Sequence, residues 1–135
     1  MQDLILAPFT KDFSLCFCWS SNAIEGNTLS LDETIAVIEY DEVESGHTFK
    51  EYQEAKNMYH AIQELLIPFR KQDITEEWMK KANGIILGTD GEYRSHTVYI
   101  GSVVEAVYYP PSYEEVPKLM KQFKDYSVLL IKFDQ

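Results

Sequence analysis

The sequence lacks the features that direct a chain into or across a membrane. Its 135 residues contain no apolar run of about eighteen residues, so no membrane-spanning helix is expected. The first residues carry neither a basic region nor a long apolar segment, so no signal peptide is expected either. A hydrophobic content of 45% is ordinary for a soluble chain. We therefore expect one cytoplasmic domain, or part of one.

Basic residues are scarce. Twelve Lys and Arg stand against 22 Asp and Glu, which gives a formal net charge of −10. Binding to nucleic acid draws most of its affinity from Lys and Arg on phosphates, and anionic membrane surfaces attract the same residues. The charge balance therefore argues against both nucleic acid and membranes as partners.

Cysteine is also rare, with only Cys16 and Cys18 in the chain. Two residues apart, they fall on different sides of a helix, and the sequence shows no metal-ligand spacing. We expect a reduced, buried pair without chemistry, and no metal site.

The residues that are present predict a mainly α-helical fold. A first helix is expected from after Thr10 to about Ile24, largely buried because its apolar residues point to nearly every side, although a buried strand over 15–19 fits almost as well. Later helices are marked by a hydroxyl or carboxyl residue three positions before a glutamate. These pairs are Ser30–Glu33, Thr48–Glu51 for a helix over 49–66, Asp73–Glu76 for one over 74–87, and Ser112–Glu115. The predicted inward stripes are Leu31, Ile35 and Ile38; Tyr52, Ala55, Tyr59, Ile62 and Leu66; Ile74, Trp78, Ala82 and Ile85; and Val116, Leu119, Met120 and Phe123.

The pattern changes after Gly88. Turn residues are followed by β-branched and aromatic residues, which predicts a short hairpin or flap over 89–101. Pro110 and Pro111 then favour an extended connection, because residues that precede proline avoid the helical conformation.

Ser21 and Glu25 stand out near the end of the first helix. Four residues apart, they share one helix face, and Gly26 follows where a left-handed residue would end the helix. A hydroxyl and a carboxylate are thus presented together. On spacing alone, a solvated or salt-bridged helix-end glutamate explains Glu25 at least as well.

A resemblance gives these residues a role. Ser21 to Gly26 resembles the inhibitory motif [S/T]-x-x-x-E-[G/N] of the Fic family of AMP-transferring enzymes, and the string S-x-x-I-E-G-N-x-L-x-L over 21–31 resembles members that carry it before their catalytic core. The resemblance implies a Fic-like helical bundle with a short β-hairpin flap, incomplete here. It assigns the inhibitory motif to Ser21, Glu25, Gly26 and Asn27.

A second match lies downstream, in family order. The segment Gly91-x-Tyr93-Arg94, then Val98-x-Ile100-Gly101, then Pro110-Pro111-x5-Val116-x2-Leu119-Met120 resembles the part of Fic proteins between two core helices. In that family the G-x-[FY]-R…V-x-I part forms the β-hairpin flap over the active site. The resemblance implies that a protein target docks here by strand addition. The implied flap residues are Tyr93, Arg94, Thr97, Val98, Tyr99 and Ile100, with 97–100 as the docking edge. A plain surface role for Arg94 is about as good an explanation.

The family's catalytic motif, H-[PA]-F-x-[DE]-G-N-G-R-x-x-R, does not occur in these 135 residues. None of His47, His60 and His96 begins it, and none has an informative partner in the sequence. His60 is expected at the core edge and His96 at the flap tip. We therefore expect no catalytic residue and no bound cofactor in this chain, whereas ATP and Mg2+ are implied for a full-length enzyme.

Two interpretations follow. In the first, the chain is the regulatory and target-docking portion of a Fic-type adenylyltransferase, shortened, frame-shifted or degenerate. In the second, it is a complete non-catalytic module, antitoxin-like, that binds a Fic core or a second copy of itself. Either way we expect one domain with an inhibitory helix region at 10–29, a helical part at 30–88, the flap at 89–101, a helix at 110–125 and a divergent tail at 126–135.

Overall fold

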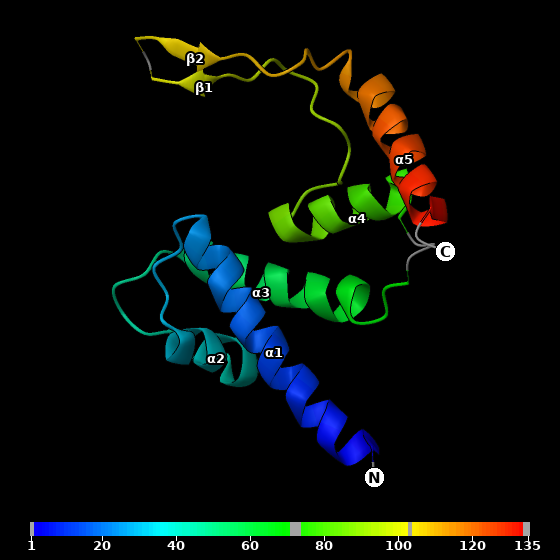
Figure 1. Ribbon diagram of the computed structural model, residues 1–135. Helices are drawn as coiled ribbons and strands as arrows, with labels where there is room; N and C mark the ends of the chain where they lie inside the picture. The colour runs from blue at the N-terminus through cyan, green and yellow to red at the C-terminus, as the bar shows by residue number, and fades with distance from the viewer. Residues whose placement is uncertain (1, 71–73, 103, 134–135) are drawn as a thin grey trace.

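The structure, a computed structural model, describes residues 2–70, 74–102 and 104–133 (Figure 1). It confirms the mainly α-helical fold with a small antiparallel sheet. The elements are α1 (Gln2–Ile24), α2 (Leu31–Tyr40), α3 (Phe49–Ala61), the π-helical turn η1 (Ile62–Leu66), α4 (Glu76–Leu87), β1 (Ile100–Gly101), β2 (Ala106–Tyr108) and α5 (Val116–Phe133). Among the described helices, none is long and apolar enough to cross a membrane.

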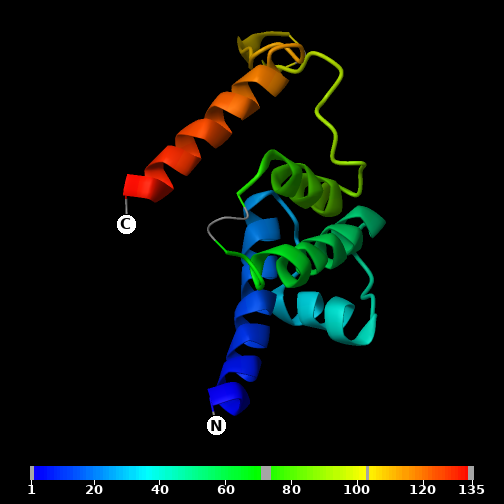
Figure 2. The same ribbon diagram turned by 90° about the vertical axis from the view of Figure 1, so that its right-hand side faces the viewer.

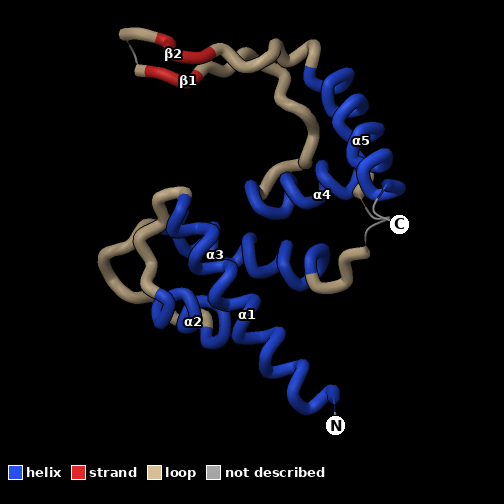
Figure 3. The backbone as a smooth tube through the Cα atoms, in the orientation of Figure 1, coloured by secondary structure: helices blue, strands red, loops and turns tan. Residues whose placement is uncertain are grey.

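Helix α3 is the centre of the packing. Helices α1 and α2 lie against it and against each other, and α4 packs on its other side. Two views at right angles show α5 beyond α4, and Figure 3 shows the β1–β2 hairpin away from the start of α5, at the other end of an extended connection (Figures 2 and 3). The ends of α1, α3 and α4 therefore meet on one side of the helical body.

Two of the predicted capping pairs form as expected. Ser30 Oγ accepts a hydrogen bond from the Glu33 backbone N–H at 3.1 Å, and Glu33 Oε2 accepts one from the Ser30 N–H at 2.7 Å. Thr48 and Glu51 make the same reciprocal pair at 3.3 and 2.9 Å. Each pair satisfies backbone N–H groups that a helix start leaves without partners, which fixes the starts of α2 and α3.

The other two pairs differ from prediction. Thr75 caps α4 through a 3.0 Å bond from the Trp78 N–H, so α4 begins at Glu76 rather than 74, and Asp73 lies outside the described residues. Ser112 and Glu115 do bond at 3.0 Å, but in a turn that precedes α5. Helix α5 also continues to 133, across the expected tail, since 126–133 contains neither Gly nor Pro to end it.

The prediction for α1 was wrong in two respects. The helix begins at Gln2 and passes through Pro8, whose fixed φ is compatible with a helix at the loss of one backbone hydrogen bond. It is also buried on one side only. Ser14, Leu15 and Cys18 face the body, whereas an outer ridge stays exposed, formed by Leu6, Phe9, Phe13 and Phe17. Because α2, α3 and η1 pack on one side of α1, its apolar outer side has no cover among the described residues.

The two cysteines lie on different sides of α1, one on its exposed side and one on its buried side. Both are free thiols, as expected, but Cys16 is exposed and only Cys18 is buried. The Cys18 thiol donates to the Ala55 carbonyl at 3.3 Å, and burial raises its pKa to about 12. The expected buried pair is therefore half right.

The core is smaller than the predicted stripes. Its main cluster joins Leu29, Val37, Tyr52 and Ala55. In α2 the deepest positions are Thr34 and Val37, while the predicted Leu31, Ile35 and Ile38 are half-buried. Towards η1 the buried positions are Ala61, Ile62 and Leu65, and Leu66 is exposed.

The hairpin lies further along the chain than predicted. Strand β1 pairs with β2 in antiparallel register, Ile100 opposite Tyr108 and Gly101 opposite Ala106, with an irregularity between the two pairs. Of the predicted flap over 89–101, only its last two residues are strand. The residues before β1 form irregular chain instead. Hydrogen bonds from the side chains of Tyr93 and Arg94 connect this chain to Glu76 of α4 and to Pro111.

Candidate functional site

The C-terminal end of α1 is shaped by a glycine turn. Gly26 adopts a φ of +95°, a left-handed conformation that favours glycine. The Asn27 N–H donates to the Asn22 carbonyl at 3.0 Å, and the Gly26 N–H donates to the Ala23 carbonyl at 3.1 Å. These two hydrogen bonds end the helix at Ile24 and place Glu25 in the turn that follows, close to where the sequence predicts the helix end.

Ser21 and Glu25 face one hollow of about 430 Å3. It lies where the ends of three helices meet and is lined by Ser21, Asn22 and Glu25 of α1 and the turn after it, Lys50, Glu54 and Met58 of α3, and Ile86 and Leu87 of α4. The predicted convergence of the hydroxyl and the carboxylate is therefore present in the fold.

The Glu25 carboxylate is available in this hollow. It is exposed, and it has no hydrogen-bond or ion-pair partner among the described residues. The cation on the same wall, Lys50, pairs with Glu54 at 3.6 Å. Two carboxylates against one ammonium group disfavour an anion here and favour an incoming cation such as a guanidinium.

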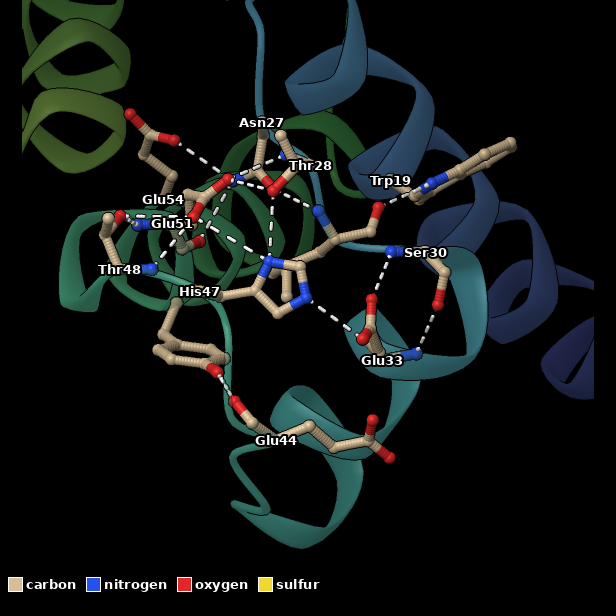
Figure 4. A network of polar contacts seen from close by, with 12 residues as sticks. Trp19, Asn27, Thr28, Ser30, Glu33, Glu44, His47, Thr48, Glu51 and Glu54 are labelled. Atoms are coloured by element: carbon tan, nitrogen blue, oxygen red, sulfur yellow. Dashed lines mark hydrogen bonds and ion pairs between the residues drawn. The ribbon is translucent and has the colours of Figure 1, made fainter.

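Asn27 anchors the chain segment that follows Gly26 to helix α3. Its side chain is buried; its Nδ2 donates to the Glu51 carbonyl and to Glu54 Oε2, both at 3.0 Å, and its Oδ1 accepts from the Leu29 N–H at 3.0 Å (Figure 4). Within the predicted inhibitory motif, Gly26 and Asn27 thus shape and anchor the chain, and Ser21 and Glu25 face the hollow.

A polar network around His47 anchors the next residues, and the sequence did not predict it (Figure 4). Thr28 donates from its N–H and its hydroxyl to Glu51 Oε1, at 2.8 and 2.5 Å. The His47 ring lies between Thr28 Oγ1 and Glu33 Oε1, 3.0 Å from each. The hydrogen bond from the Thr28 hydroxyl, with those from backbone N–H groups, lowers the pKa of Glu51 to about 2, and the Ser30 N–H with His47 lowers the pKa of Glu33.

Tyr93 and Arg94, which the sequence assigned to the flap, make contacts within the chain. The Tyr93 hydroxyl donates to Glu76 Oε1 at 2.6 Å, Lys80 Nζ lies 4.5 Å from the ring centre, and burial with the neighbouring Glu76 raises the pKa of Tyr93 to about 12. Arg94 donates to the backbone carbonyls of His96, at 3.0 Å, and Pro111. These bonds hold the irregular segment before β1 in place.

The expected docking edge is only partly strand. Of 97–100, Ile100 alone belongs to β1; Thr97 and Tyr99 are exposed, Val98 is half-buried, and Tyr99 lies against Tyr109 with ring centres 6.4 Å apart. Target docking at this edge stays a prediction.

Comparisons with known proteins connect this geometry to one family. No family model matches the sequence. A curated relative, "Protein adenylyltransferase Fic" of Nematostella vectensis, is 29% identical over 115 residues, which cover 80% of this chain and 26% of the relative. Among solved structures, a Fic domain containing signaling protein of Bacteroides thetaiotaomicron superposes with a TM-score of 0.81 at 27% identity, over 96% of this chain and 51% of that one. A Fic family protein of Desulfovibrio desulfuricans superposes with a TM-score of 0.71 at 26% identity, over 93% and 40%.

In sequence and in fold, this chain is similar to Fic proteins. It spans about a quarter of the length of its curated relative and half of the Bacteroides structure. The fold and the order of elements are thus those of the family over the matched region.

The histidines of this chain lie apart from the hollow. His60 is exposed and pairs with Glu64 at 2.8 Å, so its expected place at the core edge was wrong. His96 lies before β1 rather than at the hairpin tip. His47 joins the network around Thr28, through the carboxylates of the two capping pairs, Glu33 and Glu51. Within the described residues, no three His, Cys, Asp or Glu side chains are grouped as a metal site would need.

Proposed function

We propose that this chain supplies the inhibitory helix and the target-docking surface of a Fic-type protein adenylyltransferase, which transfers AMP from ATP to a protein hydroxyl. The observation that carries the proposal is the placement of Ser21 and Glu25 on one hollow, with the Glu25 carboxylate unpaired among the described residues. The adenylyltransferase name of the Nematostella relative supports it.

In this proposal Glu25 receives the second arginine of the family's catalytic motif. A carboxylate–guanidinium pair with two parallel hydrogen bonds is among the stronger polar contacts in proteins. While that arginine is paired with Glu25, it is withheld from the nucleotide, whose γ-phosphate cannot then bind productively. Ser21, one turn earlier on the same face, holds the helix against the nucleotide site.

The chain by itself does not fit ATP and Mg2+. Its hollow carries Glu25 and Glu54 against Lys50 alone, and among the described residues no cluster suits a metal ion. Catalysis is therefore assigned to a motif that these 135 residues do not contain. We expect no AMP transfer from the purified chain, measured with labelled ATP.

The docking surface in this proposal is the open edge of β1. Strand β1 has β2 as its one partner among the described residues, so its other edge presents backbone groups to an extended target segment. Tyr93 and Arg94 act indirectly, because their bonds to Glu76 and Pro111 fix the chain that leads into β1.

The test is a chimera in which this chain replaces the matched segment of the Nematostella adenylyltransferase. We expect AMP transfer to rise at least tenfold in Glu25→Ala over the unmodified chimera, because the arginine is released. Glu42→Ala is the matched control, since Glu42 is an exposed loop glutamate away from the hollow. Equal activity of Glu25→Ala and Glu42→Ala in folded, ATP-binding chimeras would overturn the inhibitory role.

A second function, a non-catalytic binding module, is favoured by one observation. The outer ridge of α1 leaves Phe9 and Phe13 more than half exposed, and α5 exposes Leu119, Phe123 and Tyr126. Apolar area of this kind gains about 25 cal/mol per Å2 when covered, which favours association with a Fic core or with a second copy. Light scattering on the purified chain tests this, and a monomer at micromolar concentration that also ignores an added Fic core contradicts it.

A further inference from the structure

We propose that His47 is a positioning residue for the inhibitory glutamate: its protonated ring fastens the chain that follows Glu25 to α2 and α3, so that inhibition depends on pH. The effect on inhibition rests on the proposed function above. The fastening itself does not, and it can be measured on this chain alone.

The donors and acceptors around the His47 ring indicate which of its two nitrogens carry a hydrogen. His47 Nε2 lies 3.0 Å from Glu33 Oε1, and an ionised carboxylate only accepts, so Nε2 carries a hydrogen. His47 Nδ1 lies 3.0 Å from Thr28 Oγ1, and Thr28 has one hydroxyl hydrogen, which the 2.5 Å contact directs to Glu51. Nδ1 must then donate as well. Only the doubly protonated ring satisfies all three partners.

Loss of the Nδ1 proton of His47 breaks the hydrogen bond between Thr28 and Glu51. A neutral ring keeps its bond to Glu33 but must accept at Nδ1, so the Thr28 hydroxyl turns from Glu51 to His47. One charge-assisted hydrogen bond is lost, together with the attraction between the imidazolium and both carboxylates. Histidine is the side chain that ordinarily changes charge between pH 5 and 8, so an experiment over this range tests the loss of the proton.

The network reaches Glu25 through a short, fixed segment. Thr28 lies three residues after Glu25, and Asn27 between them is bonded both to the α1 end and to α3. Ser30, at the far end of the segment, caps α2. The Glu25 backbone is therefore held from two sides, by the end of α1, where its N–H donates to the Asn22 carbonyl at 3.1 Å, and by segment 26–30.

The groups that face His47 are few. They are Glu33 of α2, Glu51 and the edge-on ring of Tyr52 of α3, the latter with ring centres 6.1 Å apart, and Thr28 of the segment after α1. The His47 side chain is 12% exposed, so water replaces these partners poorly. A charged ring meets two carboxylates and no cation among the described residues.

The first experiment follows the ring and backbone signals of the 135-residue chain by NMR from pH 5.5 to 8.5. We expect the amide shifts of 26–30 to move together with the His47 ring titration. We also expect the melting temperature to fall with rising pH by about 3 °C or more relative to His47→Lys, which keeps its charge throughout this range. The control is His60→Gln, which removes an exposed histidine from another part of α3 and should keep the wild-type slope.

The second experiment uses the chimera and compares Glu25→Ala with the unmodified protein at each pH. We expect the inhibition ratio to fall severalfold from pH 6 to pH 8 and to stay constant when His47→Lys is introduced. Amide shifts of 26–30 that do not follow the His47 ring overturn the proposal, and this result is obtained on the wild-type chain even if His47→Lys fails to fold. A ratio that is one at every pH refutes the proposed inhibition by Glu25 and leaves the NMR result to decide the fastening.

Discussion

Replacement of Asn27 by alanine removes the anchor between the end of α1 and α3. Asn27 is 8% exposed, and its side chain makes three hydrogen bonds: to the Glu51 carbonyl, to the Glu54 carboxylate and from the Leu29 N–H. Alanine keeps the Cβ and removes all three bonds. The backbone turn at Gly26 remains, so the change isolates the side-chain anchor.

The magnitude follows from which groups lose their partner. The Leu29 N–H belongs to a residue that is 3% exposed, and a buried donor without an acceptor costs about 1–3 kcal/mol. The bond to Glu54 is charge-assisted, but its carboxylate is about a third exposed and water replaces part of it. The Glu51 carbonyl lies inside α3 and loses least. We expect a total loss of about 3 kcal/mol in the free energy of unfolding.

The assay is urea unfolding followed by both circular dichroism and tryptophan fluorescence, whose agreement tests two-state behaviour. At this chain length, about 3 kcal/mol corresponds to a fall in melting temperature of about 10 °C. The matched control is Asn83→Ala, an exposed asparagine on α4 with no side-chain partner among the described residues, which we expect to stay within about 0.5 kcal/mol of wild type. An effect of Asn27→Ala no larger than that of Asn83→Ala refutes the reasoning.

Three further outcomes are expected. A thiol reagent should modify Cys16 rapidly and Cys18 only on unfolding, because burial raises the Cys18 pKa to about 12; two fast thiols in the native chain contradict this. Gly91→Ala should destabilise far more than Gly46→Ala, because both have positive φ but only at Gly91 would a Cβ lie 2.2 Å from a backbone oxygen; melting temperatures decide it. The pKa of Glu51 is lowered to about 2 from 4.5, so its stabilisation is complete above pH 4.5 and lost as pH falls towards 2; Glu51→Gln should flatten that part of the pH–stability curve, and an unchanged slope counts against it.

Local rules predicted the parts of this fold that depend on near neighbours. The capping pairs at Ser30 and Thr48 and the glycine end of α1 each involve residues within five positions, so spacing alone identifies them. The same holds for the shared face of Ser21 and Glu25, which needs only the helical period.

Sequence spacing could not predict which of several similar surfaces or segments pack together in the fold. The outer and inner sides of α1 are both apolar in sequence, and only the packing of α2, α3 and η1 decides which is covered. The hairpin was misplaced because 98–100 and 107–109 are equally rich in β-forming residues, and the bond of Arg94 to Pro111 acts over 17 positions. His47 joins Glu33 over 14 positions, which no periodic pattern indicates.

The exposed phenylalanine ridge on α1 affects how the folding of this chain can be monitored. Phe9, Phe13 and Phe17 follow one another on the outer side of a folded helix, with ring centres 6.4 Å apart in the stacked first pair and 6.0 Å apart in the tilted second pair. Fluorescent dyes such as ANS, whose binding is commonly read as a sign of a molten globule, will find this ridge in the native state. Strong dye fluorescence from this protein therefore indicates the exposed ridge of the native state. A molten globule would be recognised instead by the loss of cooperative unfolding.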